Sequence, residues 1–283
     1  MIGFNTFNEF IESLPKMVSV HKRGSDIYNL LQKLLRKEIE QQFMNDARYR
    51  NTQPFGVIDF PYHNMGNVDT LNLFDLDELI IFSFYWSNKA RYKNVADLGA
   101  NLGLHSIMLS KCGFNIKAYE PDNLHFSILQ ENIKNNNCHS VELFNNAVSD
   151  SEGEVEFVRV LGNTTSSHIM GDKNPYGDLE TIKVKTCEFK KIIAWADLIK
   201  MDVEGHEFVL VSSTDKSDWE NTDAMIEISH EENAKKVFDF FNSIGVSMYA
   251  QKILWEKVTK LEDMPTSYKE GTLFVSNRGK PFV

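Results

Sequence analysis

Residues 95–120 (VADLGANLGLHSIMLSKCGFNIKAYE) constrain the fold more than any other part of the chain. An apolar run ending at Leu98 is followed by the glycine turn GANLG, and the next apolar residues recur at the spacing of a helix. A second apolar run ends at Glu120. Strand, tight turn, helix and strand, with an acid at or near the end of each strand, predict the first unit of a doubly wound α/β sheet.

The glycine turn predicts a nucleoside ligand. Glycines let the backbone approach a bound molecule closely, and helix N-terminal N–H groups face the crevice at the carboxyl ends of the strands. Glu120 follows Gly99 by about 20 residues, the separation typical of a carboxylate that accepts ribose hydroxyls.

The residue patterns that the glycine turn lacks narrow the choice of nucleoside ligand. The turn lacks the G-x-G-x-x-G pattern of dinucleotide sites and the Gly-Lys-Ser/Thr of a P-loop. An acid, Asp97, in place of a phosphate cradle favours a cationic ligand, and S-adenosylmethionine fits because it carries an amine and a sulfonium. This motif alone leaves open an ordinary glycine turn in another α/β protein.

Length and composition predict a soluble globular protein. A chain of 283 residues can bury a full core, and 42% hydrophobic with 25% charged residues is ordinary. The net charge of −10 argues against nucleic acid as the main partner. Three separated cysteines without C-x-x-C spacing, no signal peptide in residues 1–16 and no apolar stretch of membrane-spanning length predict a cytoplasmic location.

The rest of the chain predicts alternating strands and helices. Residues 1–50 should be helical and pack on the domain, with membrane-surface docking or a helical dimer contact, and so a homo-oligomer, left open. The aromatic segment 53–66 is expected to give a short strand and a loop, and this loop either packs or walls a substrate pocket. Further strands are predicted at 141–144, 197–203, 224–228, 247–255 and 272–275. Helices are predicted at 75–88, from 121–122 to the asparagines at 135–137, after residue 207 with Phe208 and Leu210 inward, and from 229–232 through 241.

Two β-branched segments, 155–160 and 181–186, predict an inserted hairpin. The polar residues 162–177 between them are a candidate flexible lid or acceptor-binding loop. Together these elements predict a Rossmann-like α/β fold with seven strands and helices on both faces. The expected division is an N-terminal helical extension, residues 1–73, and a larger domain, residues 74–283.

The chain resembles the FkbM family of S-adenosylmethionine-dependent methyltransferases. The resemblance rests on VADLGANLG, AYEPD, NNAVSDSEGEVEF, IKMDVEGHE and IEISHEE, which stand in the family's order. Members of this family look like O-methyltransferases that act on macrolides, sugars and glycoconjugates and have the seven-stranded sheet of class I methyltransferases. The resemblance does not reach the first 70 or so residues, so it does not imply which acceptor is methylated.

The resemblance also assigns the cofactor-binding residues by position. The cofactor loop matches Asp97, Gly99, Ala100, Asn101 and Gly103. The ribose-binding acid and the residue after it match Glu120 and Pro121. The adenine-binding pair matches Asn146 and Ala147, and the acid after the fourth strand matches Asp202.

Methyl transfer to a hydroxyl requires alignment and removal of the acceptor's proton. Asp202, at the carboxyl end of a central strand, is the best placed carboxylate, and Glu204, His206 and His230 are the next catalytic candidates. Each has a structural alternative: Glu204 beside a helix N-terminus, and the histidines as hydrogen-bonded surface or core residues.

Two further possibilities concern neighbouring acids. Glu207 matches the family's acidic motif, or it is a capping partner of the helix that follows. Asp202, Glu204 and either Glu227 or Glu231 could hold Mg²⁺, which would give a metal-assisted route.

The sequence therefore predicts an O-methyltransferase whose acceptor is a hydroxyl of a sugar or glycan precursor. The alternatives are a polyketide or other small metabolite as acceptor, a nucleoside-binding module without catalysis, and an NAD-dependent oxidoreductase. The expected partner is a small-molecule or glycan acceptor, with no nucleic acid and no transmembrane segment.

Overall fold

The N-terminal segment is helical, as predicted. The computed structural model describes residues 10–161, 163–172 and 177–282, so residues 1–9 of the predicted helical region lie outside the described residues. Two short turns, η1 (Leu14–Lys16) and η2 (Val18–Val20), lead into α2 (Asp26–Asn45), and the antiparallel hairpin β1 (Tyr49–Asn51) and β2 (Val57–Asp59) follows. Helix α2 begins after Ser25, whose Oγ accepts a hydrogen bond from the N–H of Tyr28.

The central sheet has eight strands in the order β13-β12-β14-β11-β10-β3-β4-β5. The inner strands are parallel, and β14 is antiparallel to both of its neighbours. The strands are β3 (Asn94–Leu98), β4 (Asn115–Tyr119), β5 (Val141–Phe144), β10 (Leu198–Met201), β11 (Asp223–Ile226), β12 (Met248–Ala250), β13 (Glu256–Lys257) and β14 (Leu273–Val275). The Rossmann-like α/β prediction is confirmed.

The predicted count of seven strands is one too few. The segment 247–255, predicted as one strand, ends as a strand at Ala250 and continues as the turn η6 (Gln251–Ile253). Leu254 and Trp255 both have φ of 61°, which reverses the chain direction. The two residues after this reversal form β13, the eighth strand, antiparallel to β12.

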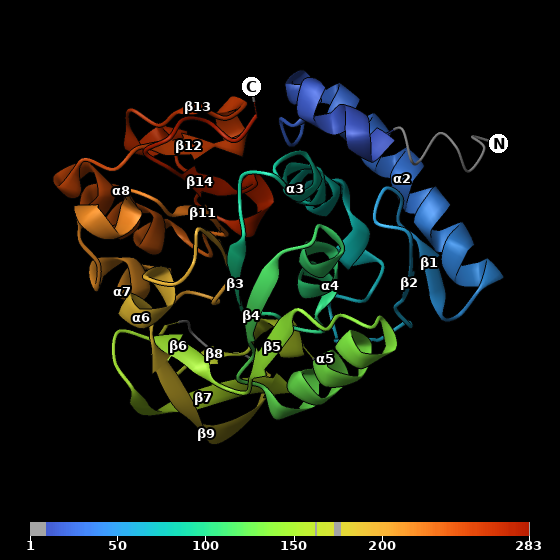
Figure 1. The fold of residues 1–283 in the computed structure, drawn as a ribbon, viewed down its shortest axis with the longest axis horizontal. Coiled ribbons are helices and arrows are strands. Elements are labelled where there is room, and N and C mark those ends of the chain that lie inside the picture. Colours follow the sequence, from blue (N-terminus) through green and yellow to red (C-terminus); the bar gives the residue numbers. More distant parts are fainter. Residues whose placement is uncertain (1–9, 162, 173–176, 283) are drawn as a thin grey trace.

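Helices cover both faces of the sheet, as predicted (Figure 1). On one face lie α3 (Leu76–Ser87), α4 (Leu104–Lys111) and α5 (Asn123–Asn135), and on the other α6 (Phe189–Ile193), α7 (Glu207–Ser212) and α8 (Glu231–Ile244). Side chains alternate along a strand, so Val95 and Leu198 join the first core and Ala96 and Ile199 join the second. Both faces of the inner strands are therefore buried, as parallel sheets require.

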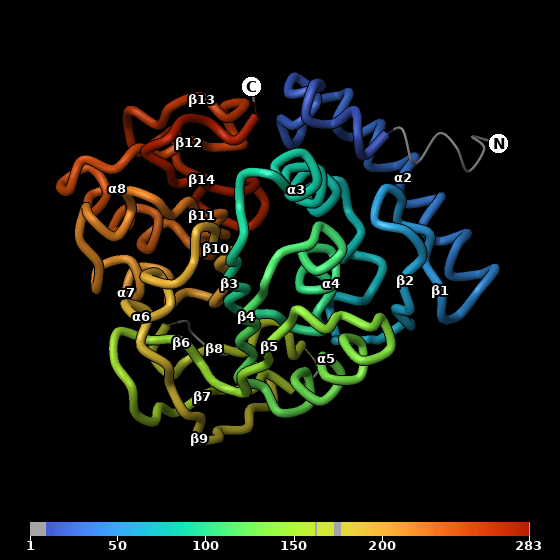
Figure 2. Tube along the Cα trace, viewed as in Figure 1, coloured from blue at the N-terminus to red at the C-terminus, as the bar shows by residue number. Residues whose placement is uncertain are grey.

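The predicted hairpin is confirmed as the centre of a second sheet, which lies beside the carboxyl end of β5 (Figure 2). Its strands are β6 (Ala147–Ser149), β7 (Gly153–Leu161), β8 (His168–Ile169) and β9 (Asp178–Glu188), in the order β6-β9-β7-β8. The turn η4 (Thr164–Ser166) lies between β7 and β8. Of the predicted lid, residues 162 and 173–176 lie outside the described residues.

The N-terminal segment shares the core of the larger domain. Buried residues such as Leu14 and Tyr28 pack in the same cluster as α3 and Phe282. His21 accepts a hydrogen bond from Trp255 Nε1 at 2.9 Å, so the beginning and end of the described chain lie side by side (Figures 1 and 2). A division between residues 73 and 74 remains a prediction.

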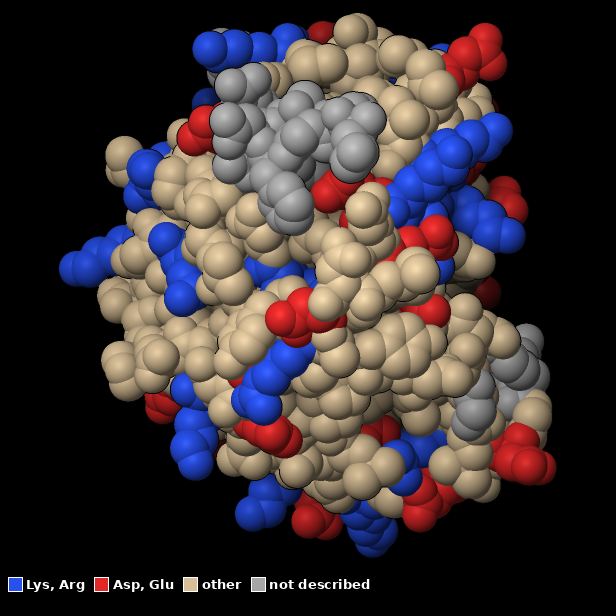
Figure 3. Space-filling view, turned by 90° about the vertical axis from the view of Figure 1, so that its right-hand side faces the viewer, with Lys and Arg blue, Asp and Glu red and all other residues tan. Residues whose placement is uncertain are grey.

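The remaining turns are η3 (Asn72–Phe74), η5 (Lys216–Trp219), η7 (Leu261–Asp263) and η8 (Tyr268–Glu270). Among the described residues, no helix combines the length and the apolar character needed to cross a membrane. On the face in Figure 3, basic and acidic side chains of the described residues are interspersed, with no continuous basic surface.

Candidate active site

A cavity of about 1010 Å³ opens where the inner strands end. Its wall includes the residues that follow β3, β4, β10 and β11, together with part of the second sheet and part of the N-terminal segment. This is the carboxyl edge of the sheet, where open α/β sheets bind their ligands.

The glycine turn between β3 and α4 has two packing constraints. Gly99 lines the cavity at φ 75°, and a Cβ there would lie 1.8 Å from the backbone oxygen of Asp202. Gly103 starts α4 at φ 89°, and its Cβ would lie 2.4 Å from Leu129 Cδ1 of α5. Gly103 and the buried Ala100 do not line the cavity, so these two residues support the turn from behind.

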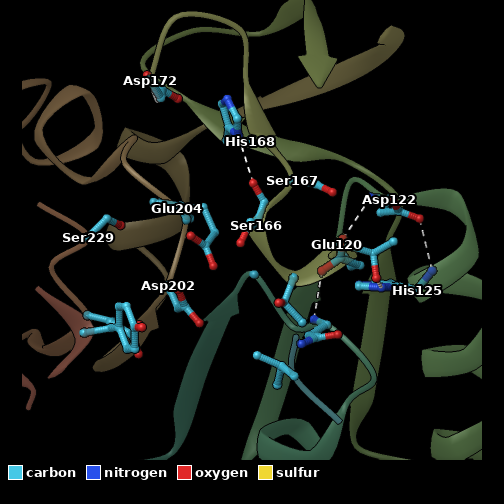
Figure 4. Close-up of a pocket in the computed structure, with 18 of the residues that line it drawn as sticks. Glu120, Asp122, His125, Ser166, Ser167, His168, Asp172, Asp202, Glu204 and Ser229 are labelled. Atoms are coloured by element: carbon cyan, nitrogen blue, oxygen red, sulfur yellow. Dashed lines mark hydrogen bonds between the residues drawn. The ribbon is translucent and has the colours of Figure 1, made fainter. Parts of the chain in front are cut away.

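Glu120 and Asn101 form the ribose end of the predicted cofactor site. Asn101 N–H donates to Glu120 Oε2 and Asp122 N–H donates to Oε1, each at 2.8 Å. Burial raises the pKa of Glu120 to about 7, although both backbone donors favour the carboxylate. Glu120 faces the cavity (Figure 4), and Asn101 Oδ1 is a buried acceptor without a partner among the described residues.

The predicted adenine-binding pair also lies in the wall. Asn146 and Ala147 line the cavity with Pro121, and Phe157 and Val160 of β7 add apolar surface. Apolar side chains beside a carboxylate suit a purine ring that carries a ribose.

Asp97 lies beneath the turn, out of the cavity wall. It is fully buried, and its Oδ2 accepts a hydrogen bond from Ser106 Oγ of α4 at 2.6 Å. Its Oδ1 has no hydrogen-bond partner among the described residues and lies 3.7 Å from Lys200 Nζ. The side chain of this β3 residue points into the protein, so direct contact with a ligand in the cavity has no support here.

Lys200 was not identified from the sequence. It is a β10 residue whose Nζ donates to the carbonyl of Gly99 at 2.9 Å and lies 3.7 Å from Asp202 Oδ2. The signal was present, because a lysine inside the apolar run ADLIKMDV must find buried partners.

Three carboxylates gather where β10 and β11 end. Asp202, Glu204 and Glu227 all line the cavity, and Figure 4 shows Asp202 and Glu204 across it from Glu120. Glu204 has a φ of 56°, a strained value for this residue type that occurs often at functional sites. Burial raises the pKa of Glu227 well above its usual value, and the nearby Asp202 and Glu204 raise it further.

The two catalytic histidine candidates have other partners. His206 lies outside the wall, with Nε2 3.1 Å from Ser149 Oγ and Nδ1 2.9 Å from Asp172 Oδ2. His230 lines the cavity, but its Nδ1 accepts a hydrogen bond from the N–H of Asn233 and caps α8. His206 thus has both ring nitrogens engaged outside the wall, whereas His230 keeps Nε2, for which the described residues provide no hydrogen-bond partner.

Glu207 is a structural residue in α7. It is fully buried and accepts hydrogen bonds from Gly205 N–H, Ser229 Oγ and Asn233 Nδ2. The capping-box alternative is not confirmed, because the N-cap of α7 is His206, which has no side-chain cap hydrogen bond, and Gly205 lies one residue before it.

The far end of the cavity is closed by the N-terminal segment. Arg23 lies 2.5 Å from Asp77 and donates to the carbonyl of Tyr268 at 2.8 Å. The aromatic residues 53–66 do not line the cavity; Phe55 and Phe60 are buried in the core instead. For that segment the prediction that it packs in the core is confirmed, and the alternative prediction that it walls a substrate pocket is wrong.

The charge of the wall suits a cation. Among the described residues that line the cavity, one is a lysine or arginine, and it is Arg23. Against it stand the acids Asp75, Asp77, Glu78, Glu120, Asp122, Asp172, Asp202, Glu204, Glu227 and Glu232. Burial raises the pKa of Asp75 to about 6 and that of Asp77 above its usual value. The donor set therefore fits S-adenosylmethionine, whose net charge is positive at neutral pH.

Mg²⁺ gains no such support. In the described part of the chain, no group of three or more His, Cys, Asp or Glu side chains is arranged to hold a metal ion.

The strand order, with one antiparallel strand between β11 and β12, and the cavity over β3, β4 and β10 define a class I methyltransferase fold. Residues 97–250 match the sequence model of the Methyltransferase FkbM domain, which is more than half of the chain. The chain belongs to the FkbM methyltransferase family. This family implies S-adenosylmethionine as the methyl donor.

Several solved structures are similar at low sequence identity. The bifunctional kinase-methyltransferase WbdD is 13% identical with a TM-score of 0.39, and the match covers 70% of this chain and 39% of WbdD. A precorrin-6y C5,15-methyltransferase from Geobacter metallireducens GS-15 is 10% identical with a TM-score of 0.39, and the match covers 69% of this chain and 85% of that one. A StiE O-MT structure is 11% identical with a TM-score of 0.35, covering 60% of this chain and 52% of the other. A search of the curated proteins by sequence finds no match.

Proposed function

We propose that this protein is a cytoplasmic O-methyltransferase that methylates a hydroxyl of a sugar or glycan precursor. The observation that carries the proposal is the group of carboxylates Asp202, Glu204 and Glu227 in the same cavity as Glu120 and Asn101. One end of the cavity thus suits a nucleoside, and the other offers bases for an acceptor proton.

Each part of the wall has a role in this proposal. Bound S-adenosylmethionine supplies an electrophilic methyl group on a sulfonium. The Glu120 carboxylate accepts the ribose hydroxyls, and Asn146 and Ala147 flank the adenine. Asp202, at the carboxyl end of β10, orients the acceptor hydroxyl and takes up its proton as the new C–O bond forms, while the bond from sulfur to the methyl carbon would break and leave the demethylated thioether.

A polar acceptor fits the cavity. Asn67, Asn72, Ser229 and Thr272 line it and offer neutral donors and acceptors suited to a polyol. An acidic wall disfavours a strongly anionic acceptor. A polyketide or another small metabolite with free hydroxyls is the second candidate.

Calorimetry followed by a turnover assay tests the proposal. The purified protein should bind S-adenosylmethionine and its demethylated product, and it should methylate at least one member of a panel of sugars and hydroxylated metabolites, with the product detected by mass spectrometry. Asp202→Asn should lower kcat by about 10²–10⁴-fold. Asp239→Asn, an exposed carboxylate on α8, is the matched control and should keep the activity.

Other outcomes point elsewhere. Binding of the donor without turnover on any acceptor would favour the module without catalysis, and competition by NAD(H) would favour an oxidoreductase. Loss of turnover in EDTA that Mg²⁺ restores would bring the metal-assisted route back. Absence of donor binding would overturn the proposal.

A further inference from the structure

Lys200 lies where the cofactor turn and the acidic strand ends meet. Its side chain is buried, and it pairs in register with Asp97 on the neighbouring strand β3. Its Nζ donates to the Gly99 carbonyl at 2.9 Å and lies 3.7 Å from both Asp97 Oδ1 and Asp202 Oδ2. One ammonium between two carboxylates gives this Asp97–Lys200–Asp202 cluster a net charge of minus one.

We propose that Lys200 is a positioning residue: it fixes the Gly99 turn against β10, and it limits the net charge of the Asp97–Lys200–Asp202 cluster beside the methyl-donor site to minus one. This inference rests on the proposed function, because it concerns the site for S-adenosylmethionine. The donor carries a sulfonium, an ammonium and a carboxylate, so its net charge at neutral pH is plus one. Its demethylated product lacks the sulfonium charge and is neutral overall, so the cluster favours the donor over the product.

The other charged groups near Lys200 support a permanent ammonium. Burial alone would lower the pKa of Lys200, but the carboxylates around it raise the pKa above its usual value. These carboxylates come from β3, from the ends of β10 and β11, and from α3: Asp97, Asp202, Glu227 and Glu78. The negative charge of Glu204 also affects this group of acids, because it raises the pKa of Glu227.

Removal of the ammonium should change the protonation of the site. With methionine in place of Lys200, the fully buried Asp97 would lack a cation, with the carboxylate of Asp202 nearby, and one proton should be taken up by this pair. Binding of the cationic donor would then expel this proton. Arginine keeps the charge and should keep the wild-type behaviour.

Titration calorimetry in buffers of different ionisation enthalpy measures the protons exchanged when S-adenosylmethionine binds. Lys200→Met should release more protons per donor bound than the wild type, by up to roughly one. Lys200→Arg should match the wild type. A purely structural lysine would lower affinity in Lys200→Met without changing the proton number, and that result would overturn the inference.

Asp202→Asn gives a second test that does not depend on the folding of Lys200→Met. In this variant Asp97 is the remaining carboxylate of the cluster beside Lys200, so the net charge of the cluster is zero. The affinity for S-adenosylmethionine should fall by about tenfold, and the affinity for the demethylated product by no more than about twofold. Equal losses for the two ligands would overturn the inference while the proposed function stands. Failure of the wild type to bind the donor would overturn both.

Discussion

Glu120 is placed for ligand binding at a cost in stability. Its pKa is about 7 in the folded protein because of burial, against 4.5 for the free side chain. Between these two values the unfolded chain gives up the proton more readily than the folded one. The Glu120 contribution to the free energy of unfolding should therefore fall as pH rises from 4.5 to about 7.

The pH dependence of urea unfolding in wild type and Glu120→Gln tests this expectation. The difference in the free energy of unfolding between the two proteins should change steadily across this pH window, because glutamine does not titrate. Asp239→Asn should follow the wild type. A constant difference between wild type and Glu120→Gln would show that the carboxyl ionises equally easily in both states.

Two glycines with similar backbone angles allow close approach to be separated from backbone strain. A Cβ at Gly99 would lie 1.8 Å from the Asp202 backbone oxygen, whereas at Gly113, with φ of 91°, nothing lies within 4 Å. Gly113→Ala should cost about 1 kcal/mol from its left-handed conformation alone. Gly99→Ala should cost more than about 3 kcal/mol, because main chain must move. Thermal or urea unfolding measures both, and equal losses would contradict the close-approach argument.

The sequence predicted the residues of the cavity wall that follow strands β3, β4 and β10, but not which charged residues lie below the wall. Gly99, Asn101, Glu120 and Asp202 line the cavity as strand-end residues should. Asp97 and Lys200 belong to the same motifs, yet they lie beneath the floor. The position of a motif indicates where a strand ends. Whether a side chain there faces the ligand or the neighbouring strand depends on how the strands pair in the sheet, and the local sequence does not determine this pairing.

At the scale of elements, β-branched runs predicted the β7–β9 hairpin correctly, whereas the reversal at Leu254 and Trp255 was missed because it requires left-handed backbone at large residues. The hairpin is joined to the loop before α5 by Arg159, whose Nε donates to Asp122 Oδ2 at 2.6 Å. Asp122 is 1% exposed. This ion pair therefore fixes the second sheet beside the ribose end of the cavity.

Arg159 should stabilise the protein through its buried partner and not through its exposed one. Arg159→Met leaves Asp122 buried without a cation and should cost about 3 kcal/mol at neutral pH. Glu180→Gln removes the exposed partner of the same arginine and should cost less than about 0.5 kcal/mol. Urea unfolding measures both changes.

The pH dependence of the Arg159→Met variant gives an independent check. Burial raises the pKa of Asp122, but the hydrogen bond from Arg159 and other contacts bring it below its usual value. The stability that the pair contributes should be lost as pH falls and Asp122 takes up a proton. The cost of Arg159→Met should shrink in acid, and a cost independent of pH would contradict the assignment.

At the scale of the whole molecule, His21 joins the N-terminal segment to the C-terminal strands. Burial lowers the pKa of His21 from 6.5 to about 4, and its ring lies between the Leu14 carbonyl and Trp255 Nε1. Below pH 6.5 the unfolded chain binds a proton that folded His21 refuses, so its contribution to stability should be lost as pH falls from 6.5 to about 4.

Wild type and His21→Gln, followed by tryptophan fluorescence during urea unfolding, should differ most near neutral pH and converge toward pH 4. The exposed His139 is the matched control, because His139→Gln should parallel the wild type throughout. A difference for His21→Gln that stays constant across this range would mean that His21 takes up a proton as readily in the folded protein as in the unfolded chain.

The alternation of strands and helices predicted the overall architecture, because hydrophobic periodicity reports which face of each element is buried. It did not predict the contribution of the N-terminal segment to the cavity. Arg23 reaches the wall through its ion pair with Asp77, and Tyr268 approaches from the other end of the chain. Contacts between residues so far apart in sequence depend on the assembled sheet, and neither segment carries a local signal for them.

The contact between His21 and Trp255 has a consequence for synthesis. His21 leaves the ribosome before its partners Trp255, 234 residues further along the chain, and Phe282. At about 5–20 residues per second, the N-terminal helices wait many seconds before the surface on which they pack exists. The ligand cavity therefore stays incomplete until these partners have been translated, and the nascent polypeptide should begin to bind the donor only then.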